Sequence, residues 1–285
     1  MGGFPRLCIV LRTRCEQKII VNKRGVFGLL RLNAFQLKWI AIVGMVLNHV
    51  VYAWWEVVPF WLAFPLYAVG GLTFPIMAYF VVEGYRHTSN LKKYIIRLLI
   101  FGLIAVPFHA LTFRMFSLNI MFTIIVSILC LVMYDKIKIR PLFWILFILV
   151  CILTAIPFFF DWAIIGVIVV LLTHIIKNEK IRRVVPSVVA GIFMLLFSLA
   201  GYLAVTNDID IGVSGPMAEP DFLLVGMVFI IGCLTAALLL KGFNGERGKR
   251  MKWMFYTFYP VHLAVLGVVA WAAGWVTLDV LRIWL

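Results

Sequence analysis

The chain has 285 residues, of which 64% are hydrophobic and 13% are charged, and its formal net charge is +14. Soluble globular proteins use roughly 45–50% apolar residues, so this composition excludes an ordinary soluble domain. The apolar runs are long and continuous rather than alternating, which excludes a membrane β-barrel and predicts an all-α, polytopic bundle of transmembrane helices.

Nine apolar runs follow a basic N-terminal segment. Residues 1–31 hold seven of the Lys and Arg residues and are expected to form a cytoplasmic segment ahead of a helical domain over residues 32–285. Several runs approach the roughly 20 residues that a helix needs to cross a bilayer. The apolar tail from Trp271 to Leu285 leaves a tenth, half-length span open. The nine runs cover residues 33–52, 60–82, 94–113, 116–134, 142–158, 161–176, 184–205, 221–240 and 254–275.

The positive charges alternate with these runs along the chain. Of the 26 Lys and Arg residues, 23 lie in the N-terminal segment or in every second connection, whereas Asp and Glu gather in the other connections. The positive-inside rule therefore predicts a cytoplasmic N-terminus in the cell (plasma) membrane. Because this distribution accounts for the basic charge, the expected partner is the lipid bilayer and no nucleic acid.

Two polar side chains interrupt the outer half of the first run. Asn48 and His49 are expensive inside a bilayer, because lipid offers them no hydrogen-bond partner. Imidazole exchanges protons near neutral pH, so His49 is a candidate catalytic base with Asn48 beside it. The alternative is a packing histidine that bonds to a neighbouring helix.

Two further polar residues are expected on the same side of the membrane. Asp161 opens the sixth run, and a carboxylate there would fix the tautomer of His49 and raise the basicity of its ring. The alternative for Asp161 is a solvated helix cap. Asn119 opens the fourth run and is expected to face the same pocket.

A cluster of charges ends the second run on the cytoplasmic side. Its cationic side chains would suit an anionic ligand that carries phosphate, although any cytoplasmic loop is expected to be basic. Glu83, at the edge of the apolar run, is expected to pair with Arg86 three residues on. The cluster consists of Glu83, Arg86, His87, Lys92, Lys93 and Arg97.

The last run carries Tyr259 and His262, which are one helical turn apart and are expected to line the same pocket. The alternative is an aromatic belt residue and a structural histidine. The five Cys residues show no metal-ligand spacing, so no metal is expected. No serine-centred elbow, P-loop or glycine-rich dinucleotide turn is present, which leaves soluble hydrolase and nucleotide-hydrolysing chemistry unsupported.

Five segments, taken in order, resemble the TraX family over about Leu37 to Leu263. TraX proteins are membrane proteins named for the N-terminal acetylation of a conjugative pilin subunit. They are similar to a wider group of transmembrane acyltransferases, which use acyl-CoA and an essential His in the first core helix. The segments are LKWIAIVGMVLNHV, LTFPIMAYFVVEGYRHTSNLKKYIIRLL, LNIMFTI, FDWAIIGVIVVLL and FYPVHL.

The resemblance implies that His49 is the catalytic His and that Glu83, Arg86 and His87 belong to the family signature. The family often has Asp directly before this His, whereas the present chain has Asn48. An adjacent carboxylate is then missing, which moves the task of activating His49 to Asp161.

The expected function is an integral membrane acyltransferase with acetyl-CoA or another acyl-CoA as donor. Its acceptor would be an exported or surface group, such as a pilin-like protein or a glycan. His49 would act as general base, Asn48 or Asn119 would stabilise the oxyanion, and the basic inner cluster would hold the CoA phosphates. The rival interpretations are a proton-coupled transporter or flippase and a non-catalytic assembly factor for a surface structure.

Overall fold

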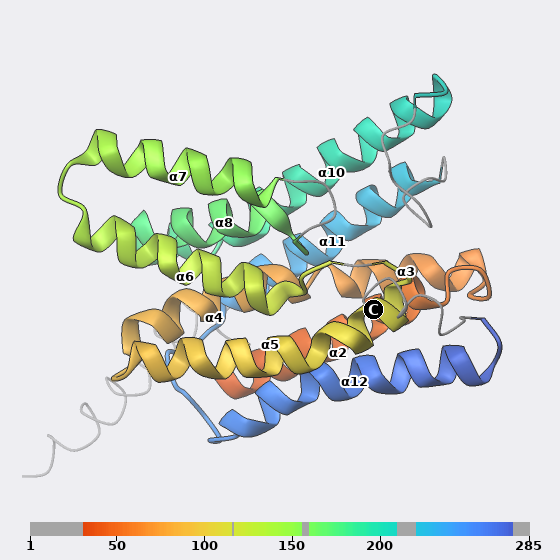
Figure 1. Cartoon of the computed structure of the whole chain (residues 1–285), viewed down its shortest axis with the longest axis horizontal. Coiled ribbons are helices and arrows are strands. Elements are labelled where there is room, and N and C mark those ends of the chain that lie inside the picture. Colours follow the sequence, from red (N-terminus) through yellow and green to blue (C-terminus); the bar gives the residue numbers. More distant parts are fainter. Residues whose placement is uncertain (1–30, 116, 156–159, 210–220, 276–285) are drawn as a thin grey trace, which may run out of the picture.

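The computed structural model describes residues 31–115, 117–155, 160–209 and 221–275, and all the regular secondary structure in these ranges is α-helical. Figure 1 shows the helices gathered into an elongated bundle with most of their axes along its length. The helices are α2 (Ala34–Ala53), α3 (Phe60–Gly70), α4 (Thr73–His87), α5 (Leu91–Phe113), α6 (Ile120–Lys136), α7 (Arg140–Thr154), α8 (Ala163–Ile175), α9 (Glu179–Arg182), α10 (Val185–Thr206), α11 (Phe222–Lys241) and α12 (Lys252–Ala272).

Six helical segments of the described chain are long and apolar enough to cross a membrane. Helices α7 and α8 are also apolar but have only 15 and 13 residues. The helices cover the nine expected runs in order, which confirms an all-helical membrane protein. The basic segment before residue 31 and the end of the possible tenth span, residues 276–285, lie outside the described residues. The six segments are Ala34–Ala53, Phe60–His87, Leu91–Phe113, Glu179–Thr206, Phe222–Lys241 and Trp253–Ala272.

The expected second span is two helices rather than one. Helix α3 ends at Gly70, and α4 begins at Thr73. Between them the backbone of Gly71 lies against α11, where a Cβ on Gly71 would be 2.3 Å from the carbonyl oxygen of Phe229. Only a glycine permits so close an approach. The break therefore falls where α3, α4 and α11 meet, a feature that hydropathy alone does not reveal.

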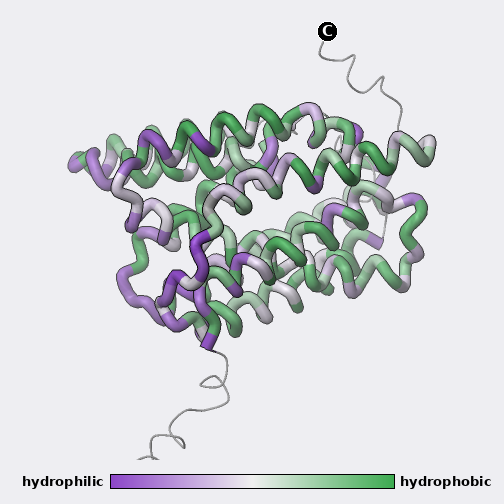
Figure 2. The backbone as a smooth tube through the Cα atoms, turned by 90° about the horizontal axis from the view of Figure 1, so that it is seen from below, coloured by the Kyte–Doolittle hydropathy of each residue, from purple (hydrophilic) through white to green (hydrophobic). Residues whose placement is uncertain are grey.

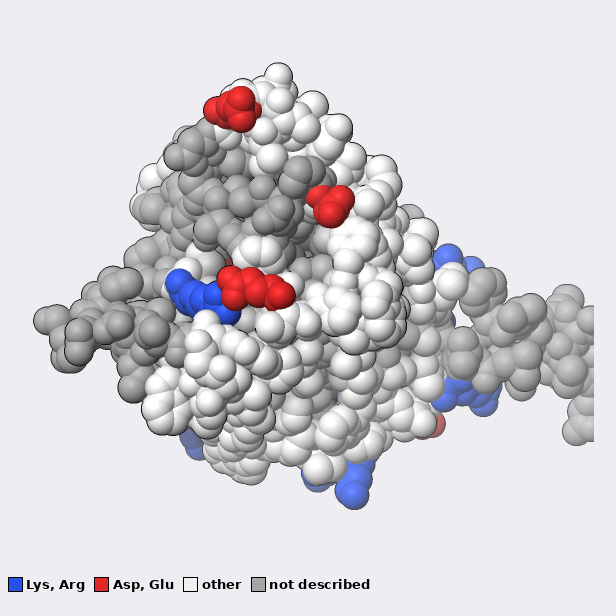
Figure 3. Space-filling view, turned by 90° about the vertical axis from the view of Figure 1, so that its right-hand side faces the viewer, with Lys and Arg blue, Asp and Glu red and all other residues white. Residues whose placement is uncertain are grey.

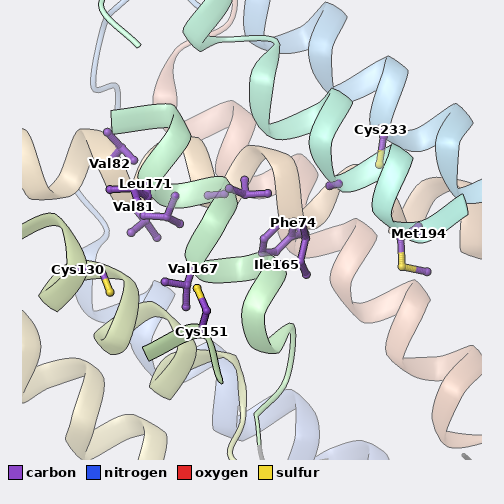
Figure 4. Packing of buried hydrophobic residues seen from close by; sticks show 14 of the residues in the cluster. Phe74, Val81, Val82, Cys130, Cys151, Ile165, Val167, Leu171, Met194 and Cys233 are labelled. Carbon is purple, nitrogen blue, oxygen red and sulfur yellow. The ribbon is translucent and has the colours of Figure 1, made fainter. Parts of the chain in front are cut away.

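Helix α4 lies at the centre of the bundle and packs against α2, α6, α8, α10 and α11. Its apolar side chains meet those of α8 in the main hydrophobic cluster, which Figure 4 shows from close by. On the other side of α2, helices α5 and α12 pack closely against each other. This arrangement places α2 between the central helix and the α5–α12 pair. Among the residues drawn in Figure 4 are Phe74, Val81, Val82, Ile165, Val167 and Leu171.

The two ends of the bundle differ in charge. The end of the bundle that we call basic is formed by the α4–α5, α6–α7, α8–α10 and α11–α12 connections, which are rich in Lys and Arg. The end that we call acidic lies opposite and includes Glu56 and Asp208. Figure 2 shows hydrophilic residues gathered at one end of the tube and apolar residues along the helices. Figure 3 looks onto the right-hand end of Figure 1, where acidic side chains stand out on a mostly uncharged face. At the acidic end Arg114 forms an ion pair with Glu56, at 3.0 Å.

Candidate functional site

A cavity of about 720 Å³ runs between α2, α4, α5, α6 and α12. Toward the acidic end its wall includes Asn48, His49 and Asp161. At the basic end its wall includes the exposed residues His87 and Arg247, so the cavity opens there. Its volume falls within the range of about 300–1,000 Å³ that is usual for small-molecule sites. The space therefore connects an intramembrane histidine to the basic end of the bundle.

His49 reaches from α2 to α12. Its Nδ1 lies 2.8 Å from the Nε2 of His262, and the Nδ1 of His262 lies 2.9 Å from the carbonyl oxygen of Phe258 one turn earlier. Phe113 of α5 meets the His49 ring in a T-shaped contact. His262 is buried, whereas His49 is partly exposed and lines the cavity. The two rings thus form a hydrogen-bonded pair that faces the ligand space through His49.

Asp161 lines the same cavity, but the structure places His262, and not Asp161, at the Nδ1 of His49. Asp161 lies in the connection before α8, where its backbone N–H donates to the carbonyl of Leu118 at 2.8 Å. Burial raises the pKa of the Asp161 carboxyl from its ordinary value to about 6. The expected Asp–His pair is therefore replaced by a His–His pair.

The two asparagines have different surroundings. Asn48 lines the cavity, and its buried Oδ1 accepts no hydrogen bond from a described residue. Asn119 instead caps α6, because its Oδ1 accepts from the backbone N–H of Met121 at 3.1 Å. Its Nδ2 donates to the carbonyl of Gly102 at 2.9 Å. Asn119 is thus occupied by backbone groups, outside the cavity wall, and Asn48 is the amide beside His49.

Four cationic side chains gather where the cavity opens. None of these four forms an ion pair with another described residue. The Nζ of Lys38 lies 5.0 Å from the ring centroid of Phe80, and the Arg97 guanidinium lies 5.6 Å from that of Tyr256. Cations beside aromatic rings and without carboxylate partners suit an anionic ligand. The four are Lys38, Arg97, Arg247 and Lys249.

The charged cluster after α4 is divided between structural and cavity-lining roles. Glu83 pairs with Arg182 at 3.2 Å, and Arg86 donates to the carbonyl of His174 at 2.7 Å. The expected Glu83–Arg86 pair is therefore wrong, because α9 brings Arg182 to the carboxylate. Glu83 and His87 line the cavity, and the Nδ1 of His87 is 2.9 Å from the carbonyl oxygen of Glu83.

Lys92 and Lys93 lie in the first turn of α5, exposed and outside the cavity wall. Of the cations expected to bind phosphate, only Arg97 and His87 reach the cavity wall. Tyr259, which was expected to line the pocket, reaches the wall at the opposite end of the cavity.

Sequence reasoning missed three of the cations that line the opening. Lys38 was detectable, because a cation inside an apolar run signals a functional position. Arg247 and Lys249 are indistinguishable in sequence from other basic loop residues. Within the described ranges no group of three or more His, Cys, Asp or Glu residues is placed to hold a metal ion.

Comparisons with known proteins cover the helices that enclose the cavity. A family described as TraX protein matches residues 34–270. A protein of Dichelobacter nodosus named "Probable fimbrial assembly protein FimC, serogroup H1" is 31% identical over 248 residues, which cover 82% of this chain and 94% of that protein. No solved structure matches the chain. The family match begins at the first residue of α2 and ends within α12.

Proposed function

Because the chain belongs to the TraX family, we propose that it is a pilus-related membrane protein that transfers an acyl group from acyl-CoA to a surface acceptor. The family name and the fimbrial assembly name of the D. nodosus relative support the link to pili. The acyl-transfer chemistry is supported by the cavity. In this proposal the acceptor of the acyl group is a pilin-like protein or a glycan, and the protein lies in the plasma membrane.

One observation carries this proposal. A single cavity joins His49 to four cationic side chains that have no ion-pair partner among the described residues. An acyl-CoA has phosphates at one end and a thioester at the end of a long arm. The phosphates would bind at the basic end, and the arm would extend along the apolar middle of the cavity toward His49. Ile42, Met45 and Phe74 line that middle part.

The reaction needs a base and an oxyanion donor near one thioester. His49 takes the proton from an acceptor hydroxyl or amine, whose oxygen or nitrogen attacks the thioester carbonyl. The amide N–H of Asn48 stabilises the oxyanion. When the C–S bond breaks, the leaving thiolate takes the proton back from His49, which gives free CoA and the acylated acceptor.

The charge asymmetry of the bundle gives the direction of transfer. The basic end faces the cytoplasm by the positive-inside rule, which gives acyl-CoA access to the open end of the cavity. His49 then lies in the outer half of the bilayer, closer to the acidic end. A cytoplasmic donor would thus modify an acceptor that is exported or displayed.

The test is the binding of acetyl-CoA to the purified protein and the transfer of its labelled acetyl group. We expect His49→Gln to bind acetyl-CoA and to remain folded, while transfer falls by about 10²–10⁴-fold, because Gln cannot accept the proton. Absence of binding at millimolar acetyl-CoA would contradict the donor assignment.

A non-catalytic assembly factor is the second candidate, and the fimbrial assembly name of the D. nodosus relative favours it. In that case cells that carry His49→Gln would assemble the surface structure normally and lose no acetylation.

A further inference from the structure

The site contains a second histidine that the proposed reaction does not use. His262 is 7% exposed and does not belong to the cavity wall, so it does not touch the ligand space. His262 is nevertheless hydrogen-bonded to the His49 ring, which does line the cavity. A buried polar group inside a membrane protein requires a partner, and the identity of each partner decides which nitrogen carries a proton.

The hydrogen bonds fix the tautomer of both rings. A backbone carbonyl only accepts, so the Nδ1 of His262 carries a hydrogen and donates it to Phe258. The Nε2 of a neutral His262 is then an acceptor. Because the Nδ1 of His49 lies 2.8 Å from that acceptor, it must be the donor. The hydrogen of neutral His49 therefore sits on Nδ1, and its Nε2 keeps a free lone pair.

The ring geometry supports this bond. The two planes differ by 16°, and the centroids are 5.1 Å apart, which exceeds the N–N distance by about one ring width. The N–N line therefore runs nearly in the plane of both rings. An imidazole N–H and lone pair point in that plane, so the contact is aligned for a hydrogen bond rather than for stacking alone.

The geometry points to His262 as the positioning residue of this site, which holds His49 in the Nδ1–H tautomer and leaves Nε2 as the base. This inference rests on the proposed function. When His49 accepts a proton on Nε2, its Nδ1–H bond to His262 becomes charge-assisted and shortens. A neutral imidazole thereby takes the place that a carboxylate holds beside the histidine of a catalytic triad.

The anchoring of His262 makes it a rigid partner. Its acceptor carbonyl belongs to the preceding turn of the same helix, α12, and the Phe258 ring lies nearly parallel to the imidazole at 13°. Tyr259 meets the same ring at 5.5 Å between centroids. His262 therefore cannot rotate to offer its Nδ1 to His49 without losing the Phe258 bond and its aromatic contacts.

The experiment is nitrogen NMR of the purified, nitrogen-15 histidine-labelled protein in lipid nanodiscs above neutral pH. The chain has five His residues, and each signal is assigned by its loss in a single variant. We expect a protonated Nδ1 and an unprotonated Nε2 for His49. An Nε2–H tautomer of His49 in the unaltered protein would overturn the inference, and this measurement needs no substrate.

Variants of His262 add a second readout. His262→Phe removes the acceptor and should let His49 shift to the Nε2–H form, whereas His262→Gln keeps an acceptor oxygen and should preserve much of the Nδ1–H form. His109→Phe is the control, because His109 is a buried neighbour that makes no hydrogen bond with either ring. An unchanged His49 tautomer in His262→Phe would contradict the positioning role.

Acetyl transfer separates this inference from the proposed function. We expect His262→Phe to lower kcat with little change in KM, and His262→Gln to recover part of the loss. If the unaltered protein shows no transfer but the His49 tautomer depends on His262, the acyltransferase proposal fails while the tautomer assignment stands. If transfer occurs and the kcat of His262→Phe equals that of the unaltered protein, the positioning role fails and the proposed function stands.

Discussion

The polar residues of the cavity differ in how their charges are compensated. His49 has a hydrogen-bond partner from another helix, whereas the four cations at the opening form no ion pair with any described residue. Uncompensated charge near the apolar part of a membrane protein is unfavourable unless a ligand or water meets it. At the residue scale, these cations without ion-pair partners among the described residues therefore mark where an anionic ligand would gain the most binding free energy.

The cations at the opening give a matched pair of variants. Lys38→Met should weaken acetyl-CoA binding by about 1.5–3 kcal/mol, the range for hydrogen bonds to charged groups, which is roughly 10- to 150-fold in Kd. Lys92→Met should leave Kd nearly unchanged, because Lys92 is exposed and outside the wall. Isothermal titration of both proteins provides the comparison. Equal losses would mean that the phosphates bind across the basic end rather than in the cavity.

Asp161 gives a prediction about pH. Burial raises the pKa of its carboxyl to about 6, so the folded protein holds this proton more tightly than the unfolded chain does. Its contribution to stability is therefore largest below its ordinary pKa and is lost as pH rises through the interval up to about 6. Asp161→Asn cannot ionise and should not show this loss.

We expect Asp161→Asn to be more stable than the unaltered protein at pH 7.5, by up to about 3 kcal/mol, and the difference to shrink at pH 4.5. Thermal unfolding in one detergent at both pH values measures it. A difference that does not depend on pH would show that Asp161 titrates normally in the folded protein.

The meeting of α2 and α3 positions Asn48. A Cβ on Gly70, the last residue of α3, would lie 2.5 Å from the Oδ1 and 2.7 Å from the Cβ of Asn48. The small residue at this helix end thus allows the asparagine to sit beside His49 in the wall. At the element scale, the broken second span serves the site, because it ends α3 where α2 carries its polar pair.

Gly70→Ala should therefore destabilise the protein by about 1–3 kcal/mol, the usual cost of overpacking. Gly191→Ala in α10 is the control, because the nearest atom to a Cβ there is 3.5 Å away and removing a helical glycine stabilises by about 0.5–1 kcal/mol. Adding Asn48→Gly to Gly70→Ala removes both the Oδ1 and the Cβ of Asn48, so it should recover stability in thermal unfolding, less the roughly 0.5–1 kcal/mol cost of a glycine inside a helix. If Gly70→Ala is as stable as Gly191→Ala, the packing described for Asn48 does not hold in solution.

The charges of the whole molecule are distributed asymmetrically along its long axis. The basic end carries the connections rich in Lys and Arg, and the cavity opens there. Opposite it, the described acidic-end residues include Glu56, Arg114 and Asp208. At this scale the proposed function depends on orientation, because a donor and an acceptor from different compartments would have to reach the same histidine.

Cysteine labelling tests the orientation. Asp208→Cys should react with a membrane-impermeant maleimide in intact cells, and Arg250→Cys should react only after lysis, because the positive-inside rule predicts that the basic end faces the cytoplasm. Both positions are exposed. Cys8 and Cys15 are replaced by Ser in both proteins, while the other cysteines, Cys130, Cys151 and Cys233, are buried. The reverse labelling pattern would place His49 in the inner half of the membrane.

The helical membrane class, the order of the helices and the TraX family were all predictable from the amino-acid sequence. This was possible because a bilayer requires each span to satisfy its own backbone, so an apolar run of sufficient length becomes helical, even where the helix is broken as in the second run. The sequence also predicted His49 as a candidate functional residue, since an ionisable residue inside such a run is costly, and His49 lines the cavity. The side of the membrane that each end faces remains a prediction from charge.

Contacts between side chains of different helices could not be predicted from the sequence. His49 and His262 are 213 residues apart, and their contact depends on how α2 packs beside α12. In the same way Arg182 reaches Glu83 from α9, and Lys38 joins Arg247 in one cavity wall. Spacing along one helix predicts neighbours only within that helix. Partners on other helices are set by packing, and by the close approaches that residues such as Gly70 and Gly71 allow.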